Sequence, residues 1–393
     1  MIIHNLKANM MKSILCSLAL MAMACVPAMA QKKTASDAVH FKGDVKGVKD
    51  TLLVIVPQSD HKAKTDTVLV KNGKFDFTVH VSEPTDIRAY TPGSMRGTER
   101  AGFQVIAVPG ESAVMSGDLT SNYYLTGSKF YQQFNEVDRM MEAAQKPMQQ
   151  LVDSLQNRMK AGESQESVMK VYQEKGGKLR QELRDKMMNF IKQHPDDEAC
   201  AYLIPQMDDL ETMKEAVKLL SPAVRDGRMK NYYTRVISSM EAEEKAEAEA
   251  AKKQAAGIAA PNFTLNDING KPLSLSSLRG QYVILDFWGS WCIWCIKGFP
   301  EMKEYYNKYK GKFQILGVDC NDTQEKWKAA VQKHELPWLH VYCPRDNRQL
   351  MDAYGIQGFP TKILIDPQGK IVKTVVGEDP AFYTLLDETF GKK

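Results

Sequence analysis

A near-continuous apolar run at 282–288 leads directly into a pair of cysteines, and this succession constrains the fold more than any other part of the chain. The run has the length and composition of a buried strand, and Gly289-Ser290 supplies a turn after it. We therefore expect a strand that ends near Trp288 and a helix that opens at Cys292. Unpaired N–H groups and the positive end of the helix dipole favour a thiolate at such a position.

The spacing of the two cysteines predicts their chemistry. Cys292 is expected to attack, and Cys295, one turn further along the helix, can resolve a mixed disulfide without unfolding anything. A purely structural disulfide at this spacing would close almost no loop, and haem attachment would need histidine where Ile296 stands. A metal site would need a second ligand pair, and Cys320 and Cys343 do not form another C-x-x-C. We expect thiol–disulfide exchange, with no metal and no cofactor.

The sequence from 257 onward predicts an α/β domain. Apolar strand patterns alternate with helical patterns, and the last two strands form a hairpin. Such a pattern predicts a mixed sheet covered by helices on both faces. Strands are expected at 282–288, 313–319, 338–342, 362–366 and 371–376, and helices at 293–310, 323–335, 347–355 and 380–390.

Four motifs in this region match a known family. They are the entry segment 260–265, the sequence FWGSWCIWC at 287–295, Pro300 five residues after the second cysteine, and Gly-Phe-Pro-Thr at 358–361. In this order they resemble the thioredoxin superfamily, and within it the TlpA/ResA-like extracytoplasmic thiol–disulfide oxidoreductases, with an AhpC/TSA- or Redoxin-like domain. The resemblance covers 257–393 and implies a thioredoxin fold there.

The resemblance assigns roles to four residues. Cys292 is similar to the family's nucleophile and Cys295 to its resolving thiol, and Pro360 would be the cis-proline that faces the pair. Asp286 is similar to a buried acid that accepts the proton of the resolving thiol. An acid on an apolar strand is costly unless it has a task, although local capping or hydrogen bonding remains an alternative.

The resemblance also implies a substrate-binding surface. The backbone of Phe359 would lie beside the nucleophile, where a substrate strand can pair with it, and Thr361 belongs to the same loop. Trp291, Ile293 and Trp294 would form the apolar surface around the reactive sulfur.

Two positions depart from the family pattern. ResA-like members carry a glutamate three residues after the second cysteine, where this chain has Gly298. Glu301 should point elsewhere on the helix, so proton handling is expected to fall to Asp286 alone. The dipeptide between the cysteines is Ile-Trp and lacks the usual proline, which should alter substrate fit and redox potential.

Three further cysteines follow the N-terminal region. Cys200 stands among apolar neighbours and is expected to pack as a small hydrophobic residue. Cys320 and Cys343 each end a predicted strand. A second disulfide between them and two separate free thiols both remain open, because the sequence does not fix the distance between their Cα atoms.

Residues 1–30 have the three-part pattern of a secretory signal peptide. The apolar stretch 13–26 is too short to span a bilayer comfortably, and Ala28-Met29-Ala30 forms a small-x-small cleavage signal. We expect export to the periplasm or cell envelope of a Gram-negative bacterium. The alternatives are an uncleaved membrane anchor and a lipoprotein tethered through Cys25.

Residues 31–127 predict an antiparallel β-sandwich. Asn72-Gly73 between two alternating runs is typical of a tight hairpin, because both residues tolerate positive φ. Pro109-Gly110 is expected to join a second pair of strands. The likeness of this module to N-terminal modules of other envelope thioredoxins is weak.

Residues 128–256 predict a helical region. Met, Gln, Glu and Lys recur at helical spacing, and Pro147, Pro195, Pro205 and Pro222 are expected to start or break helices. Residues 241–253 are charged and rich in alanine, with no apolar stripe, which is typical of a solvated spacer helix.

Composition and resemblance together limit the partners. The net charge is only +4, which is too small a field for a dedicated nucleic-acid binder. We expect disulfide- or thiol-containing envelope proteins as substrates and, by the resemblance, a membrane thiol electron donor of the DsbD/CcdA kind. The preferred hypothesis is a reductant of protein disulfides. A disulfide oxidase or isomerase with the same site, and a partner-binding protein that works mainly through residues 31–256, are the alternatives.

Overall fold

The computed structural model describes residues 37–57 and 63–391. The chain divides into two compact units between Glu241 and Ala242, and each is described by itself. The predicted signal peptide at 1–30 lies outside the described residues. None of the helices in the described residues has the length and apolarity needed to cross a membrane.

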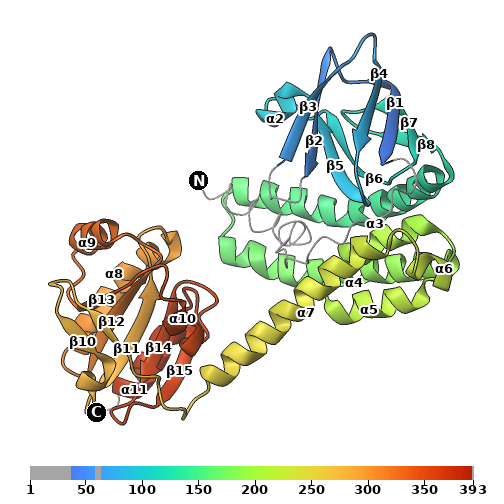
Figure 1. The fold of residues 1–393 in the computed structure, drawn as a ribbon. Helices are drawn as coiled ribbons and strands as arrows, with labels where there is room; N and C mark the ends of the chain where they lie inside the picture. Colours follow the sequence, from blue (N-terminus) through green and yellow to red (C-terminus); the bar gives the residue numbers. More distant parts are fainter. Residues whose placement is uncertain (1–36, 58–62, 392–393) are drawn as a thin grey trace. The chain divides into compact units, whose positions relative to one another are not determined.

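The first unit begins with two four-stranded sheets, in the orders β4-β1-β7-β8 and β3-β2-β5-β6 (Figure 1). Side chains alternate between buried and exposed along β1, as expected for a sheet with one covered face. Phe75 of one sheet stacks on Phe103 of the other, with ring centroids 6.2 Å apart, so the two sheets share one core. The strands are β1 (Ala38–Lys46), β2 (Thr51–Pro57), β3 (Ala63–Leu69), β4 (Lys74–His80), β5 (Thr85–Tyr90), β6 (Gly102–Ala107), β7 (Ser112–Asp118) and β8 (Tyr123–Gly127), with the short helix α2 (Pro92–Met95) between β5 and β6.

The two predicted hairpins are wrong, although one turn forms as expected. Asn72 and Gly73 have φ of 51° and 77°, and Lys71 pairs with Lys74 across them. The flanking strands β3 and β4 nevertheless belong to different sheets, as do β6 and β7. Each of these four strands pairs instead with other strands of its own sheet. The chain therefore crosses from one sheet to the other at each turn, and the inner faces of both sheets are buried in the shared core. One pair, β1 with β7, is parallel, so the sandwich is not entirely antiparallel.

The predicted helical region follows the sheets and packs on the same core. Pro147 lies inside α3 and does not break it, contrary to the expectation. The carbonyl of Ala143, which loses its hydrogen bond to the proline, belongs to an exposed residue, where water can reach it. The helices are α3 (Lys129–Lys160), α4 (Gln165–Gln193), the 3₁₀ segment η2 (Glu198–Gln206), α5 (Leu210–Leu219), α6 (Pro222–Arg225) and α7 (Lys230–Lys253).

The helix α7 changes character along its length. Its first half contributes Tyr233 to the core of the first unit, and residues 241–249 are exposed, as expected for the charged segment. After its last turn, within the second unit, the side-chain amide of Gln254 donates to the carbonyls of Tyr354 and Gly355, both at 2.9 Å. The end of this segment is therefore attached to the second unit.

The second unit contains the predicted mixed sheet flanked by helices, which is confirmed (Figure 1). The strand order is β13-β12-β11-β14-β15, in which the first three strands are parallel and the last two run antiparallel to their neighbours. The elements are β9 (Thr264–Asn266), β10 (Pro272–Ser274), η3 (Leu275–Leu278), β11 (Tyr282–Trp288), α8 (Ile293–Lys308), β12 (Phe313–Cys320), α9 (Gln324–Lys333), β13 (Leu339–Cys343), α10 (Arg348–Tyr354), β14 (Thr361–Ile365), β15 (Ile371–Val376) and α11 (Pro380–Phe390).

The two faces of β11 carry two separate cores. Phe287 packs against Tyr354 of α10, at 5.4 Å between ring centroids. Trp288 packs on the other face against Phe299 of α8, at 5.3 Å. Because side chains alternate along a strand, Asp286 lies on the same face as Trp288, under the helix that carries the cysteines.

Candidate redox site

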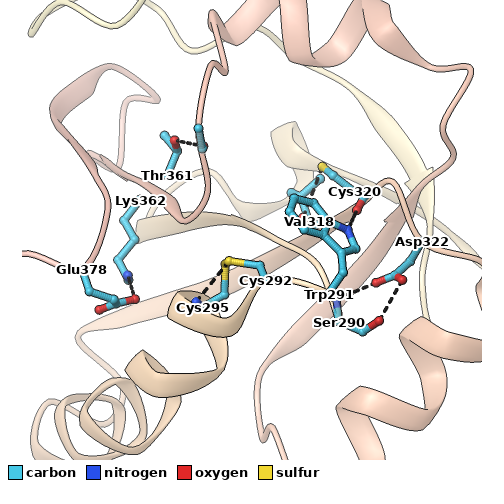
Figure 2. The surroundings of a disulfide bond; sticks show 11 residues. Ser290, Trp291, Cys292, Cys295, Val318, Cys320, Asp322, Thr361, Lys362 and Glu378 are labelled. Carbon is cyan, nitrogen blue, oxygen red and sulfur yellow. Dashed lines mark hydrogen bonds and ion pairs between the residues drawn. A yellow bond between two sulfur atoms is a disulfide. The ribbon is translucent and has the colours of Figure 1, made fainter. Parts of the chain in front are cut away.

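The two cysteines form a disulfide at the N-terminus of α8 (Figure 2). Their Cα atoms are 5.3 Å apart, and Cys292 caps the helix, its Sγ accepting the N–H of Cys295 at 3.2 Å. The predicted opening of a helix at the first cysteine is thus confirmed. Both cysteines are nearly buried, and Cys292, at 5% exposed, is slightly more accessible than Cys295, at 2%.

A network of hydrogen bonds fixes the turn before the disulfide. The backbone N–H and the hydroxyl of Ser290 both donate to the carboxylate of Asp322, at 2.6 and 2.8 Å. The indole N–H of Trp291 donates to the carbonyl of Cys320 at 3.0 Å. These contacts attach the turn to the end of β12. The sequence reasoning missed Asp322, and its position just after a strand end was the signal that could have found it.

The predicted proline loop lies beside this turn. The peptide bond between Phe359 and Pro360 is cis. The ring of Phe359 meets that of Trp291 edge to face, at 5.2 Å between centroids, so two predicted substrate-binding residues are in contact. Thr361 is fully buried, and its hydroxyl donates to the carbonyl of Gly358 at 2.7 Å. Thr361 therefore holds the loop from behind, and its predicted part in substrate binding stays a prediction.

Three large apolar side chains surround the disulfide on the surface. Trp291, Ile293 and Trp294 are 51%, 61% and 52% exposed, which is unusual for residues of this size. The side chain of Trp291 also lines a cleft of about 510 Å³, together with Asn321, Arg345, Arg348 and Met351. Large exposed apolar groups beside a reactive sulfur suit the docking of an unfolded or extended polypeptide.

Asp286 lies within the protein behind the disulfide. It is buried, and its Oδ1 atom has no hydrogen-bond partner in the described part of the chain. Burial raises the pKa of Asp286 to about 6, an effect that Lys362 opposes and Glu378 reinforces. A carboxyl whose pKa lies in this range can accept a proton near neutral pH.

Lys362 and Glu378 form a further charged pair that the sequence reasoning missed. The side chain of Lys362 is 2% exposed, and its Nζ lies 2.5 Å from the Glu378 carboxylate (Figure 2). A Cβ atom at Gly298 would clash with that carboxylate, so the absence of a side chain at 298 makes room for it. Asp286 is therefore not the only charged group behind the disulfide. A lysine inside the apolar strand 361–365 was the signal that could have revealed the pair.

Cys320 and Cys343 are brought together across two neighbouring parallel strands. They are direct partners in the β12–β13 register, both are buried, and both are free thiols in this structure. A hydrogen bond between the two thiols raises the pKa of Cys320 and lowers that of Cys343. The alternatives were a disulfide and two free thiols, and this structure contains two free thiols, on directly paired residues of adjacent strands.

Potential metal ligands gather in one place in the residues that the structure describes. Glu136, His194 and Asp197 of the first unit each offer one ligand atom, and these atoms lie within 4.8 Å of one another. The Nδ1 atom of His194 lies 3.3 Å from the carboxylate of Asp197, and Gln133 donates to that carboxylate at 2.7 Å. His194 and Asp197 thus have protein partners, and the three residues belong to the first unit rather than to the disulfide site.

The fold and the site define a class: a thioredoxin-like domain with a C-x-x-C disulfide at the start of its first main helix. Residues 256–374 match the AhpC/TSA family. The chain is 37% identical over 128 residues to "Thiol-disulfide oxidoreductase ResA" of Bacillus anthracis, covering 32% of this chain and 73% of that protein. It is 38% identical over 122 residues to the protein of the same name in Bacillus subtilis, covering 31% and 67%.

One solved structure is also similar in sequence to the second unit. The thioredoxin domain of a thiol-disulfide oxidoreductase from Bacteroides vulgatus is 36% identical and covers 35% of this chain and 98% of its own, with a TM-score of 0.33. The chain belongs to the ResA-like family of thiol-disulfide oxidoreductases, through its C-terminal third. The matched family region begins at residue 256, so the first unit lies outside it.

Proposed function

We propose that this member of the family is an exported reductant of disulfides in other envelope proteins. The observation that carries the proposal is the placement of the Cys292–Cys295 pair at the N-terminus of α8, with Asp286 buried behind it. Asp286 has a free carboxylate oxygen that can take the proton of Cys295, which is the step that releases a reduced substrate.

The reaction begins from the reduced pair. The Cys292 thiolate, favoured by the N-terminus of α8, attacks one sulfur of the substrate disulfide, and the other substrate sulfur leaves and takes up a proton. Cys295 then gives its proton to Asp286 and attacks the Cys292 sulfur. The bond from Cys292 to the substrate breaks, and its electron pair leaves with the substrate sulfur. Two electrons have passed to the substrate, and the enzyme is left with the Cys292–Cys295 disulfide.

Two partners follow from this cycle. The substrate is a disulfide-containing envelope protein that docks on Trp291, Ile293, Trp294 and the Phe359 backbone. The oxidised enzyme must then be reduced again, and we propose a membrane thiol donor of the DsbD/CcdA kind for that step, by family analogy. Export rests on the signal-like segment at 1–30, with cleavage after Ala30 or lipidation of Cys25 as its two forms.

Reduction of insulin disulfides by a small dithiol tests the proposal. We expect the wild-type protein to accelerate the reaction and Cys292→Ser to return it to the uncatalysed rate, because no other described thiol stands at a helix N-terminus beside an exposed apolar surface. Cys200→Ala is the matched control, since this thiol is buried in the first unit, and it should keep wild-type activity. Equal acceleration by wild type and Cys292→Ser would sink the proposal.

The direction of the reaction needs a separate measurement. Equilibration of the pair with glutathione gives its reduction potential. A value near the reducing end of the range, about −270 mV, supports a reductant, and a value near about −120 mV would instead indicate a disulfide oxidase.

A further inference from the structure

Three charged side chains from three different segments meet behind the disulfide. Asp286 of β11 and Lys362 of β14 are direct partners across an antiparallel pair of strands. Partners in this position point to the same face, with Cβ atoms about 5 Å apart. Glu378, from the segment between β15 and α11, binds Lys362 at 2.5 Å. The order of the charges is therefore acid, base, acid, with the lysine between the two carboxylates.

The arrangement depends on Gly298, one helical turn after Cys295. The Glu378 carboxylate fills the space that a side chain at 298 would need, so it lies against the first turns of α8 (Figure 2). Lys362 is as buried as the protein core, whereas Glu378 keeps 19% of its side chain exposed. The lysine is thus confined between the inner carboxylate and a carboxylate that reaches solvent.

The other groups around these three are neutral or more distant acids. Tyr383 of α11 is buried, and its hydroxyl has no hydrogen-bond partner in the described residues. Cys320 of β12 belongs to the core on the opposite face of the sheet, and the carboxylate of Glu301 of α8 raises the pKa of Glu378. In the part of the chain that the structure describes, Lys362 is the positive charge that lowers the pKa of Asp286.

A buried lysine needs a partner, because removal of an ammonium from water costs several kcal/mol. Glu378 supplies that partner on one side of the ammonium group. On the other side, the positive charge of Lys362 still lowers the pKa of Asp286. We propose that Lys362 is a positioning residue for the exchange reaction: it holds Asp286 as the carboxylate that accepts the Cys295 proton, and Glu378 limits how strongly it does so. The proposal rests on the proposed role of Asp286.

In the resolving step the proton moves from the Cys295 sulfur to Asp286. The Cys292–Cys295 bond forms as the bond from Cys292 to the substrate breaks, and the substrate sulfur leaves with the electron pair. The charge on Asp286 decides how fast this step runs at a given pH, because a protonated Asp286 cannot accept the proton. The observed midpoint belongs to the coupled pair Asp286 and Cys295 rather than to either group.

The test uses the reduced full-length protein and an aryl disulfide that releases a coloured thiolate. Attack by Cys292 releases the first equivalent, and resolution by Cys295 releases the second, so the two steps appear as separate phases. We expect Lys362→Met to raise the pH midpoint of the second phase by about one unit or more, because Asp286 loses its cation. Glu378→Gln keeps Lys362 and removes its neutralising charge, so it should lower the midpoint.

If the two variants shift the pH midpoint of the second phase in opposite directions, the effect comes from the charge and not from a damaged fold. Damage to the fold would slow both phases without moving the midpoints apart. Asp387→Asn on α11 is the matched control, because that carboxylate binds Lys308, Tyr305 and Tyr309 and should leave both phases unchanged. If Lys362→Met does not fold, Glu378→Gln alone decides.

A normal first phase with an unshifted second-phase midpoint in Glu378→Gln would overturn the inference and leave the proposed function intact. Absence of the first phase in the wild-type protein would instead overturn the proposed function.

Discussion

A buried carboxyl such as Asp286 costs stability in exchange for chemistry. Burial raises its pKa from 3.8 to about 6, even with Lys362 beside it. When folding raises the pKa of a carboxyl, its contribution to stability is complete at a pH below the pKa of the unfolded chain. That contribution is lost as the pH rises through the pKa of the folded protein. The shift corresponds to about 3 kcal/mol when the group is fully ionised.

We expect Asp286→Asn to stabilise the second unit at pH 8 by up to about 3 kcal/mol, with little effect at pH 4. The amide stays neutral at both values, whereas Asp286 must ionise between them. Urea unfolding followed by tryptophan fluorescence measures this unit alone, because all five tryptophans lie within it, at 288, 291, 294, 327 and 338.

Asp387→Asn is the matched control for the stability experiment. Hydrogen bonds from Lys308 and Tyr309 lower the pKa of Asp387, so its loss should not stabilise the protein at pH 8. The same stability difference for Asp286→Asn at pH 4 and pH 8 would contradict the account. The resolving step should also slow in Asp286→Asn, since its proton acceptor is gone.

At the scale of elements, short-range patterns predicted the second unit well. The strands β11 and β15 and the helix α11 have the predicted bounds, because apolar runs flanked by turn residues leave few alternatives. The sandwich was predicted less well. Asn72-Gly73 determines a local turn but not the sheet that the next strand joins, and that choice depends on long-range pairing.

The site shows the same limit. The sequence placed both cysteines, the proline loop and Asp286, because each belongs to a local motif. Lys362 and Glu378 were missed because the residues that meet at Gly298 are far apart in the chain. Only the register of β11 and β14 and the return of the chain before α11 bring them together.

One element-scale contact gives a further prediction. Gln254, just after α7, donates two hydrogen bonds to carbonyls at the end of α10, which otherwise lack helical partners. We expect Gln254→Ala to lower the free energy of unfolding of the second unit by about 1–2 kcal/mol. Gln368→Ala, at an exposed turn position, is the matched control and should change it by less than about 0.5 kcal/mol. Equal effects of the two substitutions would argue against an attachment at this point.

At the scale of the whole molecule, the matched family region begins only at residue 256. The preceding β-sandwich and helices share one core and so form one unit. We propose that this first unit selects or holds a partner for the redox domain. Under that proposal, removal of the first unit leaves insulin reduction unchanged but narrows or widens the set of natural substrates. Identical substrate sets for the full chain and residues 242–393 would contradict it.

The central claim is that Cys292 forms the bond to substrates and that Cys295 breaks it. The most direct measurement is to add the reduced Cys295→Ser variant to envelope extract and analyse its covalent adducts by mass spectrometry. The account predicts mixed disulfides between Cys292 and envelope proteins, and none in the double variant that also carries Cys292→Ser. No adduct on Cys292, or equal adducts in the double variant, would contradict it.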